Sequence, residues 1–236
     1  MSEQKKYFQF GLTQHFPCNY LPEQKERLMV VMNHELLTNE NYQRLLEAGF
    51  RRSGNQVYRP HCQLCDACES LRVPVKEFTP SRSQKRIVNN NKDIHVNISS
   101  TEKEAYYPLY ERYINTIHTD GGMYPANREQ YNNFIFSENV AQLFIELYLD
   151  DRLISVAVTD HLPNALSALY TFYDPDFPKR SLGKLSILSQ IDIAKTLQKE
   201  FLYLGYQIDA CSKMNYKNKY YPHQRLKQER WQRINK

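Results

Sequence analysis

The sequence has no apolar run long enough to cross a lipid bilayer. No segment approaches the roughly 20 apolar residues that a transmembrane helix requires, and no apolar stretch follows a basic start, as it would in a secretory signal. Internal repeats and low-complexity tracts are also absent. These absences favour a soluble cytoplasmic protein without a membrane partner.

Cysteine is scarce and unevenly placed. The chain has 5 cysteines among 236 residues, and three of them fall between positions 62 and 68. A secreted domain held together by disulfides is typically shorter and denser in cysteine. A reducing compartment therefore fits the composition better than an extracellular one.

The remaining composition is that of a folded globular protein. With 236 residues and 41% hydrophobic content, the chain can bury a core and has room for one large domain or two small ones. The formal net charge of +5 is moderate. The distribution of the charge along the chain is therefore more informative than its size.

The clustered cysteines suggest a metal site. Cys62, Cys65 and Cys68 are spaced so that their thiols can face one small volume, as a zinc ion or an iron–sulfur cluster requires. Cys18 is the natural candidate for a fourth ligand. The alternative is a set of reduced structural thiols, since a spacing motif alone is a weak signal.

Two basic stretches suggest an RNA partner. Residues 81–86 read SRSQKR, and residues 213–227 alternate cations with aromatic rings. Cations that meet phosphates, interleaved with rings that stack on unpaired bases, are typical of sites for single-stranded nucleic acid ends. A solvated surface is the alternative for the first stretch, whereas the second favours a function.

The character of the sequence changes near residue 95. We expect a cysteine-containing N-terminal region over residues 1–95 and a C-terminal domain over residues 96–236. The pattern of the first region predicts a strand, a helix, a hairpin turn and an edge strand, over residues 28–32, 38–48, 53–55 and 71–75 respectively. Thr38 can cap the helix, and Gly49 can end it in the left-handed conformation.

The second region contains longer elements. The pattern predicts two helices, three strands, a long helix and a last strand, over residues 102–117, 128–136, 142–149, 153–160, 165–173, 182–202 and 206–211. The first two strands form an antiparallel hairpin. Pro108 is expected to kink the first helix or to begin a new turn, and Gly205 is expected to end the long helix.

This order of elements favours a GNAT-like acyltransferase core. We therefore predict an α+β fold with a mixed, mostly antiparallel sheet, splayed to hold an activated acyl group against an amine. The start of the long helix carries Lys179, Arg180, Ser181 and Gly183, which suit an anion at a helix N-terminus. Because the full glycine-rich signature of coenzyme A binders is absent, the anion can belong instead to the end of a tRNA.

Several motifs in a fixed order resemble the N-end rule aminoacyl-tRNA–protein transferases. They are CNYLP at 18–22, the tri-cysteine loop with LRVPV at 71–75, SRSQKR at 81–86, YDP at 173–175 leading to SLG at 181–183, and LGY at 204–206 with KMNYK at 213–217. The chain is most similar to the short bacterial aspartate/glutamate leucyltransferases, which are related to arginyltransferases. It departs from the paired-cysteine element of arginyltransferases, since Leu21 stands three positions after Cys18.

The resemblance implies transfer of leucine from leucyl-tRNA to the α-amine of proteins that begin with Asp or Glu, which marks them for degradation. An aminoacyl ester is already activated, so neither ATP nor coenzyme A is required. Because an α-amine has a pKa of about 8, a useful fraction is neutral at physiological pH. Arginyl transfer, a metal-stabilised RNA-binding module without catalysis, and a coenzyme A-dependent acetyltransferase are the alternatives.

The candidate site residues follow from these interpretations. The third strand ends with Tyr170, Tyr173 and Asp174, at the point where the sheet would split. This position suits alignment of the aminoacyl donor and proton transfer. The alternative is that the tyrosines pack on the sheet and Asp174 forms a turn. Arginine pairs bidentately with carboxylates, so the candidates for gripping the acidic acceptor are Arg51, Arg52 and Arg72. The candidates for binding the tRNA end are Lys179, Arg180, Ser181, Gly183, Lys213, Tyr216 and Lys217.

Overall fold

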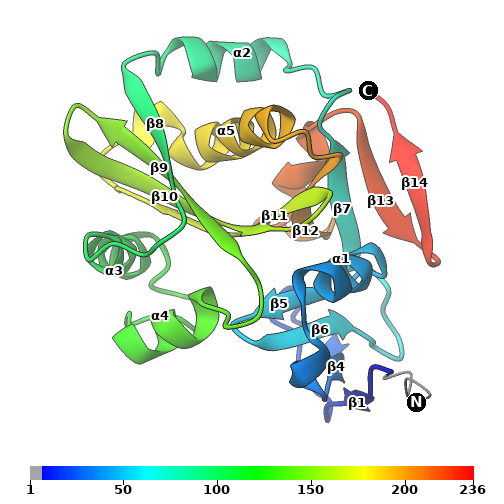
Figure 1. Cartoon of the computed structure of the whole chain (residues 1–236). Coiled ribbons are helices and arrows are strands. Elements are labelled where there is room, and N and C mark those ends of the chain that lie inside the picture. Colours follow the sequence, from blue (N-terminus) through cyan, green and yellow to red (C-terminus); the bar gives the residue numbers. More distant parts are fainter. Residues whose placement is uncertain (1–6) are drawn as a thin grey trace, which may run out of the picture.

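The computed structural model describes residues 7–236, and its largest feature is an eight-stranded sheet (Figure 1). The strands run from edge to edge in the order β14 (Arg230–Ile234), β13 (His223–Lys227), β7 (Glu69–Pro74), β12 (Phe201–Gln207), β11 (Ala165–Tyr173), β10 (Arg152–His161), β9 (Gln142–Leu149) and β8 (Ile94–Ser99). Neighbouring strands are antiparallel except β11 and β12, which are parallel. The predicted α+β fold with a mixed, mostly antiparallel sheet is confirmed.

The sheet splits at its parallel pair. β11 and β12 pair only from Ala165–Phe201 to Ser167–Tyr203, and β11 then continues to Tyr173 without this partner. The register of β12 shifts between Tyr203 and Gly205. Gly205 has a φ of +82°, a conformation that favours glycine. This opening is the splayed sheet that an acyl-transfer core of the predicted type requires.

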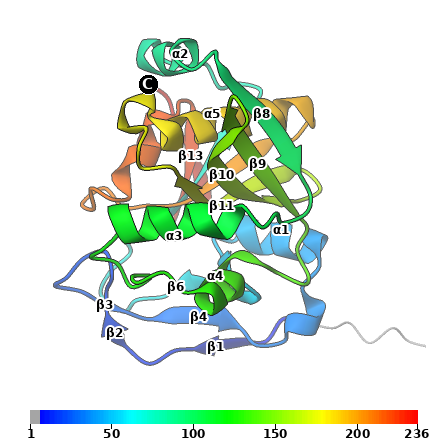
Figure 2. The same cartoon turned by 90° about the vertical axis from the view of Figure 1, so that its left-hand side faces the viewer.

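Helices cover both faces of the sheet (Figures 1 and 2). On one face, α5 (Leu182–Thr196) buries Ile187 and Ile191 against Leu71 and Leu202, and α2 (Arg82–Asn89) packs on α5. On the other face, α3 (Tyr106–Ile117) and α4 (Arg128–Ile135) pack against the strands through a cluster rich in aromatic rings. Burying one such side chain stabilises the fold by about 1.5–3 kcal/mol. These clusters therefore hold the strands on either side of the split in place.

The N-terminal region adds a smaller four-stranded sheet. Its order is β1 (Phe10–Leu12), β4 (Leu28–Val31), β6 (Gln56–Pro60) and β5 (Arg51–Ser53), and β2 (Phe16–Pro17) pairs with β3 (Lys25–Glu26) beside it. α1 (Asn39–Glu47) begins where Thr38 Oγ1 accepts a hydrogen bond from the Asn41 amide at 3.2 Å. Gly49 follows with a φ of +86°. The predicted strand, helix and hairpin of this region are confirmed.

The predicted edge strand over residues 71–75 is wrong in its position. β7 lies inside the sheet, between β12 and β13. The residues that follow position 222 form β13 and β14, which the sequence pattern did not predict, and they cover the expected edge. Pro74 is accommodated because it is the last residue of β7, where a missing N–H removes no inner ladder bond.

The long helix predicted over residues 182–202 is wrong at its C-terminal end. α5 stops at Thr196, Gln198 takes a φ of +56°, and β12 begins at Phe201. Gly205 therefore lies within β12 and does not end the helix, and the last predicted strand starts five residues earlier than expected. No glycine or proline separates Thr196 from Phe201, so the sequence carries no stop signal there and packing into the sheet decides the outcome.

The other predicted elements of the C-terminal part are confirmed. α3 begins at Tyr106, later than expected, so Pro108 lies in its first turn, where a missing N–H is tolerated. The hairpin of β9 and β10 turns at Asp150, which has a φ of +52°. No helix within residues 7–236 has the length and apolar character needed to span a membrane.

Candidate active site

A cavity of about 920 Å³ opens where β11 and β12 separate. Its walls come from β5, the end of α3, β11, the start of α5, β12 and the short helix η3 (Asn215–Lys219). Most of the predicted site residues line it: Arg51, Arg52, Tyr170, Tyr173, Ser181, Gly183, Lys213, Tyr216 and Lys217. Segments from both ends of the sequence therefore meet at the opening of the sheet.

Arg51 is a buried cation at this opening. It is 6% exposed, and its guanidinium donates to Ser167 Oγ at 2.9 Å and to the Ala168 carbonyl oxygen at 2.5 Å. It also packs on Gly205, where a Cβ would lie 3.6 Å from Nε. In the part of the chain that the structure describes, no carboxylate forms an ion pair with Arg51. A buried guanidinium without an acidic partner can receive an anionic ligand.

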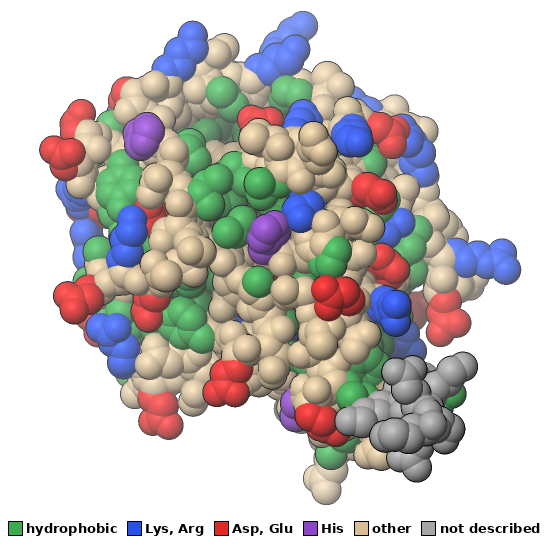
Figure 3. Space-filling view, in the orientation of Figure 1, with side chains coloured by type: hydrophobic (Ala, Val, Ile, Leu, Met, Phe, Trp, Pro, Cys, Tyr) green, Lys and Arg blue, Asp and Glu red, His purple; other side chains and the backbone are tan. Residues whose placement is uncertain are grey.

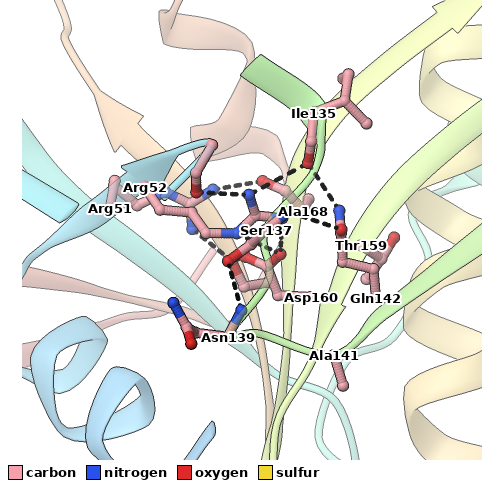
Figure 4. A network of polar contacts seen from close by, with 12 residues as sticks. Arg51, Arg52, Ile135, Ser137, Asn139, Ala141, Gln142, Thr159, Asp160 and Ala168 are labelled. Carbon is pink, nitrogen blue, oxygen red and sulfur yellow. Dashed lines mark hydrogen bonds and ion pairs between the residues drawn. The ribbon is translucent and has the colours of Figure 1, made fainter. Parts of the chain in front are cut away.

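Arg52 has a structural environment instead. Its side chain and that of Asp160 are fully buried and form an ion pair at 2.5 Å, with a further hydrogen bond from Nε at 2.8 Å. The guanidinium also donates to the carbonyl oxygens of Gly54 and Ile135, and Ser167 Oγ donates to Asp160 (Figure 4). Its donors are thus occupied by the protein, and its charge is balanced.

Aromatic rings form one wall of the cavity. Tyr113 of α3 lies with its ring centroid 4.8 Å from that of Tyr173 and 6.4 Å from that of Tyr170. Burial raises the pKa of Tyr113 and of Tyr170, so both hydroxyls keep their protons at neutral pH. They can donate hydrogen bonds to a carbonyl or an oxyanion, but they are poor bases.

The start of α5 forms another wall. Ser181 has a φ of +54° and makes no side-chain capping bond, so the first amides of the helix have no side-chain partner from it. A Cβ at Gly183 would lie 3.3 Å from the Tyr173 ring. Glycine thus allows this ring to pack on the first helical turn. Backbone N–H groups at a helix start can receive a phosphate or a carboxylate.

Lys179 and Arg180 lie outside the cavity lining. Arg180 pairs with Asp93 at 2.7 Å and donates to the Asn90 carbonyl oxygen, while Asn91 donates to the Arg180 carbonyl oxygen. These bonds join the start of α5 to the end of α2. Arg180 therefore fixes the start of α5 from outside the cavity, whereas Lys179 is exposed at the surface.

The basic stretch at residues 81–86 lies on α2. Ser81 and Gln84 form a capping box at its start, and Gln84 is buried. Arg82, Lys85 and Arg86 are exposed, and within the described residues none of them forms an ion pair. Figure 3 shows blue side chains projecting from the top of the molecule, where Figure 1 places α2.

The C-terminal basic run contributes Lys213, Tyr216 and Lys217 to the lining, and their surroundings differ. Lys213 is exposed and pairs with Asp120 at 2.7 Å. Tyr216 is 38% exposed, and Lys217 is buried with Nζ over the Tyr216 ring, 4.8 Å from its centroid. This run is therefore not a uniform solvated surface, because one of its cations faces the interior of the cavity.

Two further predicted site residues, Asp174 and Arg72, also lie outside the cavity lining. Asp174 is 1% exposed and is held by Arg112 and Arg152. Arg72 is stacked between Phe201 and Trp231, with its guanidinium carbon 3.8 Å and 4.1 Å from the ring centroids. Both side chains are held by other residues of the protein, and neither lines the cavity.

The four predicted metal ligands line one separate cavity of about 330 Å³, namely Cys18, Cys62, Cys65 and Cys68. Burial and the neighbouring thiols raise the pKa of Cys68 to about 12. The donor set suits a soft metal. However, over residues 7–236 no three Cys, His, Asp or Glu side chains are grouped closely enough to hold an ion.

Sequence reasoning missed several lining residues. Tyr113 follows the apolar pattern of α3, so nothing in the sequence separates it from a packing residue. Lys184 follows Gly183 directly and was a detectable candidate. His118, which the sequence allows as a base although a loop or packing role is the commoner one, lines the cavity with Nε2 2.9 Å from the Tyr113 hydroxyl oxygen, and burial lowers the pKa of His118.

Sequence comparisons match nearly the whole chain. The family described as "Arginine-tRNA-protein transferase, C terminus" matches residues 105–227, and its N-terminus counterpart matches residues 16–86. A protein of Pseudoalteromonas atlantica named aspartate/glutamate leucyltransferase is 54% identical over 96% of this chain and 98% of its own length. One of the same name from Aeromonas salmonicida is 53% identical over 95% of this chain and 94% of its own length.

Among solved structures, the crystal structure of FemX is similar with a TM-score of 0.44 and 8% sequence identity, over 84% of this chain and 79% of FemX. A likeness at this level adds nothing to the assignment, which follows from the sequence matches. Both family segments lie in their expected order and together span most of the sequence. The chain belongs to the arginine-tRNA–protein transferase family, among relatives named aspartate/glutamate leucyltransferases.

Proposed function

We propose that this protein transfers leucine from leucyl-tRNA to the N-terminal α-amine of proteins that begin with Asp or Glu, in the cytoplasm, so that the product carries a degradation signal. The names of relatives at 53–54% identity support this reaction. The observation that carries it in the structure is the cavity itself. Two buried basic side chains, Arg51 and Lys217, line it without an acidic partner among the described residues.

The chemistry needs positioning more than activation. The ester that joins leucine to tRNA is already reactive, so ATP and coenzyme A have no role in the proposed step. The enzyme must hold the amine near the ester carbonyl and stabilise the oxyanion that forms. Tyr113, Tyr170 and Tyr173 offer rings for the leucyl group, and the protonated hydroxyls of Tyr113 and Tyr170 can donate to the oxyanion. The start of α5 offers N–H groups to a tRNA phosphate.

Arg51 is the proposed reader of the acceptor. Its two bonded donors go to neutral oxygens, so its charge is available to a carboxylate in the cavity. A carboxylate pairs with a guanidinium more strongly than a neutral amide does. The side chain of an N-terminal Asp or Glu supplies that carboxylate.

The transfer reaction is tested with radiolabelled leucyl-tRNA and, separately, arginyl-tRNA, against peptides that begin with Asp, Glu, Asn or Ala. We expect leucine on the Asp and Glu peptides only. Transfer of arginine would change the donor and keep the reaction class. Binding of tRNA without any amide product would contradict the proposal and favour a non-catalytic RNA-binding module.

The role of Arg51 is tested by the ratio of transfer to Asp and Asn peptides. Arg51→Lys keeps the positive charge and loses the planar fork, so we expect the Asp preference to fall about 10-fold. Arg44→Lys on the exposed surface of α1 is the control and leaves the ratio unchanged. Because the ratio compares two acceptors on one enzyme preparation, a loss of folded protein does not alter it.

We also propose that the cysteine cavity binds a soft metal, as zinc or as an iron–sulfur cluster. Four thiols line one cavity, and a bound cation would favour the thiolate form that burial first and the neighbouring thiols second disfavour at Cys68. Within residues 7–236 these thiols are not yet grouped closely enough to hold an ion, so binding would draw them together. The protein purified anaerobically is expected to contain about one zinc or one cluster per chain by elemental analysis. Cys68→Ser is expected to lose it, whereas Cys211→Ser retains it; a metal-free wild-type protein would refute the site.

A further inference from the structure

Lys217 is a buried lysine whose polar contacts are all uncharged. It is 5% exposed, and Nζ donates to the Tyr206 carbonyl oxygen at 2.8 Å. The Met214 carbonyl oxygen and Sδ each lie 3.4 Å from the same atom. Among the residues described, no carboxylate pairs with this amine. A buried ammonium without a counterion is costly, which favours the neutral amine.

The groups around Lys217 act on its charge in both directions. β5 contributes the Arg51 guanidinium, η3 contributes the Tyr216 ring, and the turn after β12 contributes the Cys211 thiol. Burial first and Arg51 second lower the pKa of Lys217 to about 7, and Cys211 opposes them. A large fraction of this amine is therefore unprotonated at neutral pH.

We propose that Lys217 is the general base that receives the proton of the acceptor amine during leucyl transfer, an inference that rests on the proposed function. It is buried, it lines the cavity at the split of the sheet, and it lies beside the arginine proposed to hold the acceptor's carboxylate. An N-terminal Asp or Glu carries its carboxylate and its α-amine a few bonds apart. Binding the first group to Arg51 brings the second toward Lys217.

The proposed step is balanced in atoms and charge. The neutral acceptor amine attacks the ester carbonyl carbon, so a nitrogen–carbon bond forms and the nitrogen becomes positively charged. Neutral Lys217 takes one proton from that nitrogen. The bond between carbon and the terminal ribose oxygen then breaks, and the Lys217 ammonium returns the proton to this oxygen. The products are an amide and the free tRNA hydroxyl.

Other groups of the cavity suit this task less well. The guanidinium of Arg51 offers only N–H donors and no atom that could accept a proton, and the buried tyrosines Tyr113 and Tyr170 keep their protons. His118 is the rival base, because burial and Lys213 lower its pKa. It caps the C-terminal end of α3, however, and its Nε2 is engaged with the Tyr113 hydroxyl.

The test is the pH dependence of kcat/KM for leucyl transfer between pH 5.5 and 7. In the wild type both the acceptor amine and Lys217 must be neutral, so kcat/KM falls about 100-fold per pH unit at the acidic end. Lys217→Met leaves only the acceptor to titrate, so the slope becomes about 10-fold per unit. The rate at pH 7 is also expected to fall by at least about 100-fold.

Lys219→Met is the matched control, because Lys219 lies on the same short helix, is exposed and does not line the cavity. It is expected to keep the wild-type slope, and His118→Gln is expected to keep it too. Lys217→Arg, a permanent cation, is expected to be as slow as Lys217→Met. If either Lys217 variant is poorly folded, competitive acetylation of the wild type reports the amine directly, with a midpoint near pH 7 for Lys217, against about 10 for an ordinary lysine.

The outcomes separate this inference from the proposed function. Any one of three results would overturn the inference while leucyl transfer stands. Lys217→Met would keep the wild-type slope of kcat/KM against pH, or only His118→Gln would lose the steep slope. The third is an acetylation midpoint of Lys217 near the ordinary lysine value of about 10. Absence of transfer by the wild type would remove the proposed function, and the base would fall with it because no acceptor amine would remain.

Discussion

Arg51 and Arg52 are neighbours in sequence but have different surroundings. Both side chains line the cavity, but Arg52 is paired with the buried Asp160, whereas the donors of Arg51 go to the neutral oxygens of Ser167 and Ala168. The sequence predicted both as readers of an acidic acceptor, because arginine suits a carboxylate at either position. The partner of Arg52 lies 108 residues away in the chain, so no local pattern separates the two.

The Arg52–Asp160 pair is expected to contribute strongly to stability. Replacing Arg52 with Met leaves Asp160 buried with only Ser167 as a side-chain donor, and an uncompensated buried charge costs about 3–5 kcal/mol. Arg112→Met is the control, since Arg112 is half-exposed and Asp174 keeps Arg152; we expect less than about 1 kcal/mol there. Urea unfolding measures both, and equal losses in the two variants would contradict the assignment.

Lys217 is expected to make stability depend on pH. Its pKa is lowered from 10.5 to about 7 in the folded protein, so between these values the unfolded chain binds more protons and stability rises with pH. The cost of burial is therefore fully present below pH 7 and disappears above about pH 10.5. From pH 7 to 9, the free energy of unfolding of the wild type should gain about 2 kcal/mol relative to Lys217→Met. A constant difference between the two proteins would show an ordinary lysine.

At the scale of elements, the boundaries of helices and strands are predicted best where a local sequence signal marks each end. α1 is an example, since Thr38 and Gly49 bound it as expected. α5 has no comparable stop, because neither a glycine nor a proline separates Thr196 from Phe201. The turn there depends on Gln198 in the left-handed conformation and on the pairing of Phe201 with both β11 and β7. These long-range contacts have no local signature.

α2 is expected to bind the tRNA backbone. Its exposed cations have no acidic partners among the described residues, and its end is joined to the start of α5 at the cavity by the hydrogen bonds between Asn91 and Arg180. Replacing Arg82, Lys85 and Arg86 with Gln should weaken leucyl-tRNA binding and make it less dependent on salt, by about one unit of log–log slope for each phosphate that is no longer neutralised. Filter binding from 50 to 200 mM salt measures this effect.

The matched control for α2 is Arg44→Gln, an exposed cation on α1. It should leave both the affinity and the salt slope unchanged. A triple α2 variant with the wild-type slope would show that α2 is only a solvated surface, which was the alternative interpretation of this stretch.

At the scale of the whole molecule, the order of elements was predictable and their assembly was only partly so. The core of three antiparallel strands, a helix and a parallel strand follows from periodicity and turn residues. The site residues on this core were predictable because the split of the sheet defines where they meet. The insertion of β7 between β12 and β13 was not, because it joins residues more than 120 positions apart. The predicted boundary near residue 95 stays a prediction.

The shared sheet has a consequence for how the chain folds. Leu71 and Val73 of β7 are fully buried in the cluster that α5 covers, and β7 supplies the pairing partner of both β12 and β13. A fragment of residues 96–236 lacks β7, which exposes this cluster and leaves two unpaired strand edges. We therefore expect the fragment to lack a cooperative urea transition and to give a poorly dispersed amide NMR spectrum. The intact chain, measured alongside, should unfold in one transition. A dispersed spectrum and a cooperative transition for the fragment would show instead that the C-terminal part folds without β7, and that β7 contributes to the cavity without being required for the core.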